Sequence, residues 1–165
     1  MKHLKQIILS ISLCFLASNS TLVLADVYSD YKMYAEQAIA QVEFHKFGDA
    51  YKTFNKLSEL GFTVMAIFEK KKLECAASLK IFRSEYKAME SLSVEEIERL
   101  YHDGERFPST TPPICYFGRT LVVHPAMNKV RVKNSQDWSA EIELTAISEI
   151  RETIGYLENI KELLK

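Results

Sequence analysis

Residues 112–132, PPICYFGRTLVVHPAMNKVRV, differ from the rest of the chain, where apolar residues recur mostly at helical spacing. Two prolines open the stretch, and its second half either runs apolar or alternates apolar with basic residues. Alternation with a period of two is typical of β-strands. We therefore predict a β-hairpin over 119–133, within a non-helical insert over 106–136. The alternative is an irregular loop followed by a helix that opens at Pro125, because proline suits a first helical turn.

Helices are predicted on both sides of this insert, because apolar residues recur there at every third or fourth position. The predicted helices cover 27–46, 50–60, 63–92, a short segment after Ser93, and 139–164. The fold class is therefore mainly all-α, a small helical bundle with one disulfide-tethered loop or β-hairpin insert. In the last helix the predicted buried stripe includes Leu144.

Several residues mark where the predicted helices begin and end. Gly48 and Gly61 are expected to end helices, with Asp49 as the cap that opens the next one. Ser93 and Glu96 have the spacing of a capping box. Gly104 and the prolines after it are expected to stop the short helix. A glycine inside the last helix, Gly155, suggests a close helix crossing.

One segment resembles a known repeat. Over 34–62 a Gly-Asp-aromatic turn separates two helical patterns, with small and aromatic residues at the packing positions. The residues concerned are Phe44, Gly48, Asp49, Tyr51, Phe54 and Gly61. This segment is similar to one helical hairpin of a tetratricopeptide or Sel1-like repeat. No second copy follows, and an array needs at least three units, so the resemblance implies a helical hairpin and says nothing of function.

The N-terminal residues have the features of a secretory signal. Two lysines precede an apolar run over 7–17, and Val23 and Ala25 stand where a signal peptidase recognises its site. We predict a bacterial signal peptide over 1–25, cleaved after Ala25. An uncleaved membrane anchor is the alternative, but the apolar run is shorter than the ~20 residues that a span needs. The protein is therefore expected to be exported, either to the periplasm or out of the cell.

The charge balance limits the partners of the mature chain. The whole chain has 21 basic and 22 acidic residues. Without residues 1–25, which hold two lysines and no acid, the balance is 19 to 22, or −3. Such a chain is not expected to bind nucleic acid, which calls for a basic excess. Residues 26–165 suit a single α-helical domain, and none of their apolar stretches is long enough to span a membrane.

Two cysteines remain after the predicted cleavage, Cys75 and Cys115. Export places them in an oxidising compartment, where disulfides persist, and two thiols allow one intramolecular pairing. We predict a Cys75–Cys115 disulfide. The alternative is two unpaired thiols, and a redox-active pair is disfavoured because the chain has no CxxC motif.

Catalytic and metal motifs are missing from the sequence. The mature histidines His45, His102 and His124 do not pair at helical spacing, and HExxH, CxxCH and GxSxG are absent. Cys115 next to His102 or His124 could form a nucleophilic dyad only with a free thiol. We therefore predict no enzyme activity, no metal site and no cofactor.

A mixture of arginine and aromatic residues near the insert suggests a binding surface, since interfaces are enriched in these types. The candidate binding residues are Arg106, Phe107, Tyr116, Phe117, Arg119, His102 and His124. In the alternative interpretation the aromatic residues only cover the core and His102 interacts with a helix end. The sequence favours an exported protein that binds another protein, as an immunity or inhibitor protein does. The alternatives are a small-ligand or metal-binding helical bundle, or a secreted effector.

Overall fold

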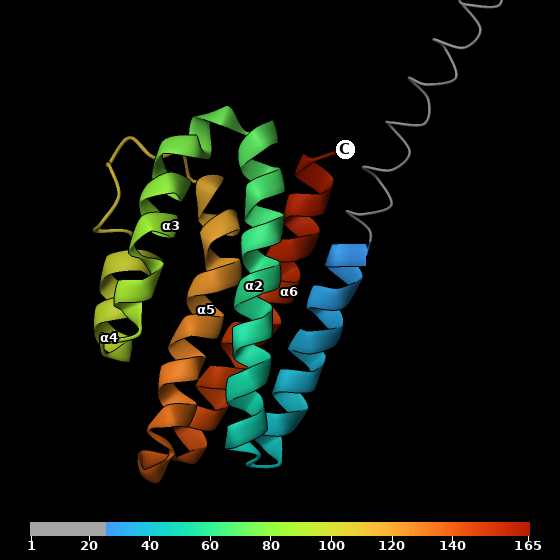
Figure 1. Cartoon of the computed structure of the whole chain (residues 1–165), viewed down its shortest axis with the longest axis vertical. Helices are drawn as coiled ribbons and strands as arrows, with labels where there is room; N and C mark the ends of the chain where they lie inside the picture. Colours follow the sequence, from blue (N-terminus) through green and yellow to red (C-terminus); the bar gives the residue numbers. More distant parts are fainter. Residues whose placement is uncertain (1–25) are drawn as a thin grey trace, which may run out of the picture.

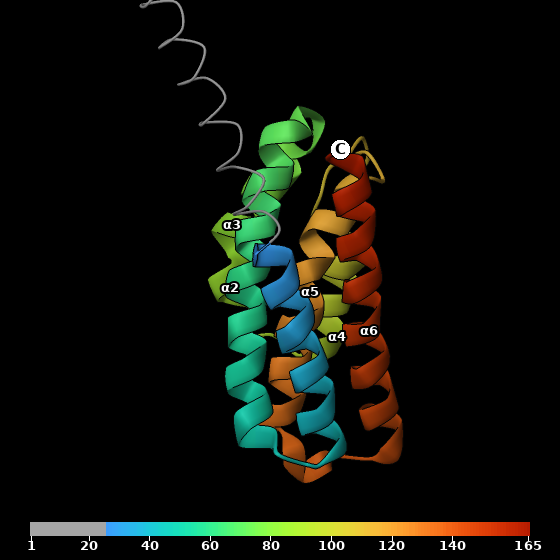
Figure 2. The ribbon, with the colours of Figure 1, turned by 90° about the vertical axis from the view of Figure 1, so that its right-hand side faces the viewer.

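The computed structural model describes residues 26–165, which form a helical bundle with no strand in this range (Figure 1). Neighbouring long helices run in alternating directions, and the first helix lies between α2 and α6 (Figure 2). The elements are the first helix (26–43), α2 (Phe47–Lys71), the 3₁₀ turn η1 (Leu73–Cys75), α3 (Ala76–Met89), α4 (Val94–Ile97), the π-helical turn η2 (Glu98–His102), α5 (Cys115–Lys133), the 3₁₀ turn η3 (Ser135–Asp137) and α6 (Ala140–Leu163). The mainly all-α fold is thus confirmed.

The centre of the bundle is α5, the segment for which the sequence predicts an insert. It packs against α2, α6 and α3, and Figure 1 shows it between its neighbours. Every residue from 118 to 129 is buried, so α5 has no face in water over this length. The β-hairpin over 119–133 and the non-helical insert over 106–136 are therefore wrong. What remains of the insert is the irregular loop over 103–114.

The central position of α5 explains the wrong prediction. An apolar period of 3.6 residues arises only when one helix face meets water, and a helix that is covered on all sides lacks it. The segment is also rich in β-branched valines, which favour strands. Pro125 lies inside the helix and does not open it. Proline removes one backbone donor, and the Tyr31 hydroxyl of the first helix bonds the Leu121 carbonyl that loses its partner.

The helix predicted to end at Gly61 continues to Lys71. A Cβ atom at position 61 would lie 2.6 Å from the backbone oxygen of Leu121 and 2.9 Å from a methyl group of Val122. Gly61 therefore allows α2 and α5 to approach closely. The glycine marks a helix crossing and not a helix end.

The predicted helical hairpin is confirmed by the turn between the first helix and α2. The cap predicted for α2, Asp49, is wrong. His45 has a positive φ of 53°, and α2 begins at Phe47. Gly48 and Asp49 are thus in the first turn of α2. The carboxylate of Asp49 accepts a hydrogen bond from Lys52 at 3.2 Å and does not cap the helix.

The predicted disulfide is present. Cys75 and Cys115 are bonded, with their Cα atoms 5.2 Å apart. Cys75 ends the 3₁₀ turn that interrupts the helix predicted over 63–92, and Cys115 is the first residue of α5. The bond therefore joins the start of α3 to the start of the central helix.

The short helix α4 begins as predicted. Ser93 accepts from the amide of Glu96, and the Glu96 carboxylate accepts from the amide of Ser93, which is the capping box. The helix widens into η2, which ends at His102. Gly104 follows with a φ of 93°, as expected for a helix stop.

The last helix is also confirmed, with Ser139 as its N-cap. Two details differ from the prediction. Leu144 does not belong to the buried stripe, because 69% of its surface is exposed. Gly155 does not mark a close crossing, because a Cβ atom there would meet nothing within 4 Å.

The predicted signal peptide, its cleavage site and the third cysteine, Cys14, lie outside the described residues. Over 26–165, each helix is too short or too polar to cross a bilayer.

Candidate functional site

Buried polar residues lie along the central helix. Thr120, His124 and Asn128 follow one another at intervals of four, so they share one face of α5. Each has at most 1% of its surface exposed. Asn128 donates to the Glu149 carboxylate at 3.0 Å and to the His124 carbonyl at 3.1 Å. This polar face meets α6 through Asn128 and meets η2 through His124, which lies beside His102.

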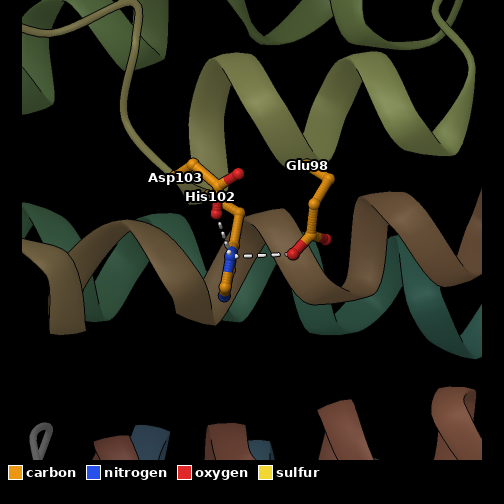
Figure 3. Close-up of side chains that lie close together, drawn as sticks. All are labelled: Glu98, His102 and Asp103. Atoms are coloured by element: carbon orange, nitrogen blue, oxygen red, sulfur yellow. Dashed lines mark hydrogen bonds and ion pairs between the residues drawn. The ribbon is translucent and has the colours of Figure 1, made fainter.

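His102 ends η2 and points at two carboxylates (Figure 3). Its Nδ1 lies 3.1 Å from Glu98 Oε1 and 3.4 Å from Asp103 Oδ1. Its Nε2 contacts the Tyr116 hydroxyl. Burial raises the pKa of Tyr116, so the phenol keeps its proton and donates it, while Nδ1–H faces the carboxylates. The chain Tyr116–His102–Glu98 is therefore a hydrogen-bonded relay with no activated nucleophile.

His124 lies next to His102, with ring centroids 4.9 Å apart. Its Nδ1 is 2.9 Å from the backbone oxygen of Glu149. A carbonyl only accepts, so Nδ1 carries a proton and Nε2 is left as an acceptor. Burial lowers the pKa of His124 to about 4, and the ring is neutral at physiological pH.

These side chains include one group of metal-ligand types among the described residues. The ligand atoms of Glu98, His102 and Asp103 lie within 4.8 Å of one another. Nitrogen and carboxylate oxygen atoms are ligands for zinc, so the group could hold such an ion. The same contacts are those of an ordinary histidine that is hydrogen-bonded beside two carboxylates, with Asp103 exposed to solvent.

Arg119 is buried beside this group, with 7% of its surface exposed. Its guanidinium carbon lies 4.5 Å from the ring centroid of Phe107 and 5.2 Å from that of Tyr116. Nη2 donates to the His102 carbonyl at 3.2 Å. No carboxylate of the described chain forms an ion pair with it. Arg119 also lines a pocket of about 200 Å³ under the loop over 103–114.

The structure brings most of the predicted binding residues together. His102, Phe107, Tyr116, Arg119 and His124 form one cluster, described by the contacts above. Arg106 does not belong to it, because it lies on Glu85, with two hydrogen bonds of 2.7 Å. Phe117 is at the edge of the cluster, where it stacks on Tyr156 at 5.5 Å, and the Tyr156 ring lies 5.4 Å from that of Tyr116. The predicted surface is thus mostly a buried cluster, and sequence reasoning missed Glu98 and Tyr156.

A second feature, which the sequence analysis missed, is a groove of about 390 Å³. It lies where α4, the end of α5, η3 and the start of α6 meet, so its lining comes from four segments. The apolar lining residues are Leu92, Val94, Val130, Trp138 and Ile142. Three carboxylates also line it, those of Glu95, Asp137 and Glu141. We call this feature the acidic groove. The single tryptophan of the chain was the only sequence signal for it.

The same end of the bundle has an exposed aromatic residue. Phe44, with 72% of its surface exposed, is in the turn before α2. The neighbouring His45 binds Glu143 at 2.7 Å, and Glu143 also accepts from the Trp138 indole at 3.3 Å. Phe44 and the acidic groove therefore lie at one end of the molecule.

The comparisons with known proteins add nothing to this description, because no family model, curated protein or solved structure matches the chain.

Proposed function

We propose that this is an exported binding protein that holds a basic segment of a partner protein in the acidic groove. The observation that carries the proposal is the groove itself, an apolar floor with three exposed carboxylates around it. A role as an immunity or inhibitor protein is one concrete form of this function. The role is binding and not catalysis.

The lining of the groove supports a protein partner. Trp138 is half-buried and packs on Phe47, with ring centroids 4.6 Å apart, so its ring is held in place. Rigid aromatic residues at the centre of a contact surface contribute much of the binding energy of protein complexes. Leu144 and Phe44 leave further apolar surface exposed at this end. Together they provide an apolar area that one partner segment could cover.

The charges of the groove support a basic partner. Glu95, Asp137 and Glu141 are exposed and form no ion pair within residues 26–165. Arg131 is the one arginine that lines the groove. Its guanidinium is bound by both carboxylate oxygens of Glu149, and the Nη2–Oε1 distance is 2.8 Å. The uncompensated charge is therefore negative, and a lysine or arginine beside an apolar side chain would match it.

Two further features support export to an oxidising compartment. The apolar leader predicted over 1–25 and the disulfide of the folded domain both suit an oxidising environment. The partner is therefore sought among periplasmic and secreted proteins.

The test uses capture of partners by the full mature chain. The groove variant carries Asp137→Lys and Glu141→Lys. The matched control carries Asp30→Lys and Glu36→Lys, an equal charge change at exposed positions of the first helix. We expect the wild type and the control to capture the same identified protein from periplasmic and secreted fractions, and the groove variant to lose it.

The purified pair then gives the affinity. We expect the Kd of the groove variant to be at least tenfold higher than that of the wild type. We also expect the wild type to bind its partner more weakly at high salt, because exposed charges are screened. Equal capture by both variants would exclude the groove as the binding surface. The absence of any specific partner in these fractions would contradict the function itself.

A small-ligand function is the second candidate. The volume of the groove, about 390 Å³, lies in the range of small-molecule sites. Trp138 would report such a ligand through its fluorescence. Metal analysis of the purified protein tests the remaining alternative, and a stoichiometric ion at Glu98, His102 and Asp103 would favour it over protein binding.

A further inference from the structure

The pocket at Arg119 is a second candidate binding site, distinct from the acidic groove. Arg119 has five N–H donors, and within the described chain one of them has an acceptor, the His102 carbonyl. Nε is fully buried without an acceptor. Burial lowers the pKa of Arg119, in keeping with a charge that lacks a counter-ion. Arg106 differs from Arg119 in this respect, because it donates to both carboxylate oxygens of Glu85.

The surrounding chain is shaped to keep this cation in place. Gly104 has a φ of 93°, which favours glycine, and a Cβ atom there would lie 3.0 Å from Nη2 of Arg119. The rings of Phe107 and Tyr116 flank the guanidinium. The disulfide at Cys115 holds the start of α5 one turn before Arg119. A buried arginine held by aromatic rings and one backbone carbonyl, and not by a carboxylate, is an unusual and costly arrangement.

We propose that this pocket binds a carboxylate carried on an apolar group. The planar guanidinium matches the two oxygens of a carboxylate. The pocket has one cation, Arg119, and the carboxylate of Asp103 also lines it. A dianion such as phosphate would be repelled by Asp103 and only half neutralised by Arg119. The rest of the wall includes Phe107, Tyr116 and prolines, which suit a small apolar group, and Ser109 and Thr111, whose hydroxyls can bond polar atoms beside it. The volume of about 200 Å³ limits the size of the apolar group.

Two sources could supply such a group, a free organic acid or the C-terminal carboxylate of a peptide. Both share the carboxylate and an adjacent apolar side chain. The test therefore uses benzoate, its neutral isostere benzamide, inorganic phosphate, and the peptide Gly-Gly-Phe with a free or an amidated C-terminus. The proposal does not depend on the acidic groove.

The first measurement needs no variant. Each probe is titrated into the folded wild-type protein, and the Nε–H signal of Arg119 is followed by NMR. We expect benzoate or the free peptide acid to shift this signal in a saturable way, with little effect of benzamide, the peptide amide or phosphate. Tighter binding of the peptide acid identifies a C-terminus as the ligand, and tighter binding of benzoate identifies a free acid.

Variants give the second measurement. Arg119→Met should weaken binding of the acids at least tenfold, Arg119→Lys should weaken it less, and the control Arg106→Met should keep wild-type affinity. If Arg119→Met does not fold, Arg119→Lys and the NMR titration still test whether the acids bind at Arg119. Equal binding of benzoate and benzamide, unchanged affinity of a folded Arg119 variant, or no response to either acid at millimolar concentration would overturn the proposal.

Discussion

Tyr31 donates its hydroxyl to the backbone carbonyl of Leu121 at 2.8 Å, across 90 residues of sequence. In a regular helix the amide of residue 125 would bond this carbonyl. Pro125 has no amide hydrogen, so the first helix supplies the donor that the central helix lacks. Tyr31 is fully buried, so no water replaces it.

The first prediction concerns this bond. Tyr31→Phe leaves the Leu121 carbonyl unpaired in the core, and we expect the free energy of unfolding to fall by about 1–3 kcal/mol. Urea denaturation measures the change. In a Pro125→Ala background the amide of residue 125 can bond the same carbonyl, so the cost of Tyr31→Phe should be smaller there. An equal cost in both backgrounds would contradict this explanation.

In Gly61→Ala the overpacking should cost about 1–3 kcal/mol. The added methyl group would lie 2.6 Å from the Leu121 oxygen and would push α2 away from α5. This cost should exceed the ~1 kcal/mol that alanine gains over glycine in a helix. Thermal unfolding measures the sum, and a rise in Tm would show that the two helices do not pack as closely as described.

Gly155→Ala is the matched substitution with the opposite expectation. This glycine is inside α6, and a Cβ atom there would meet nothing within 4 Å. We expect a gain of roughly 0.5–1 kcal/mol, because alanine loses less conformational entropy in a helix. The same thermal experiment serves for both glycines, and a loss of stability here would indicate an undetected contact.

Removal of the disulfide should lower stability by about 4 kcal/mol, the chain-entropy value for a closed loop of this size. The two cysteines are 40 residues apart. The measurement is denaturation of the Cys75→Ser, Cys115→Ser double variant against the oxidised wild type. Thiol labelling of unreduced, denatured wild-type protein checks the bond itself, and labelling of both cysteines would exclude it.

The buried ring of His124 should make stability depend on pH. Burial lowers its pKa from 6.5 to about 4, so between these pH values the unfolded chain binds a proton that the folded protein does not. Its contribution is therefore complete above about pH 6.5 and is lost as the pH falls towards about 4. The full effect is about 3 kcal/mol.

The variant His124→Asn can keep a donor for the Glu149 carbonyl and removes the titrating ring. We expect its unfolding free energy to fall less steeply between pH 6.5 and 4 than that of the wild type. NMR of the wild-type ring gives an independent check. A His124 ring that becomes protonated near pH 6.5 in the folded protein would contradict the prediction.

Much of the helical structure could be predicted because its signals are local. The capping box of Ser93 and Glu96 depends on residues within one turn. The first helix, α3 and α6 each keep a wet face, so their apolar spacing is visible in the sequence. The disulfide followed from the number of cysteines together with the predicted export, and the structure confirms it.

The candidate sites could be predicted only in part. His102, Tyr116 and Arg119 stood out by residue type, but their burial and their contacts depend on how η2 and α5 pack. The acidic groove combines residues from four segments. No local pattern links Leu92 to Trp138, because their proximity arises only when α4 packs near the start of α6.

The sequence by itself determined the helices that have one face in water, the capping box of Ser93 and Glu96, and the pairing of Cys75 with Cys115. Only the tertiary structure decided that residues 115–133 form the central helix. The physical reason is that a helix covered on every side carries no apolar period, while its valines and Pro125 locally favour other structures. Burial by its neighbours, the close approach at Gly61 and the donor from Tyr31 outweigh those local preferences.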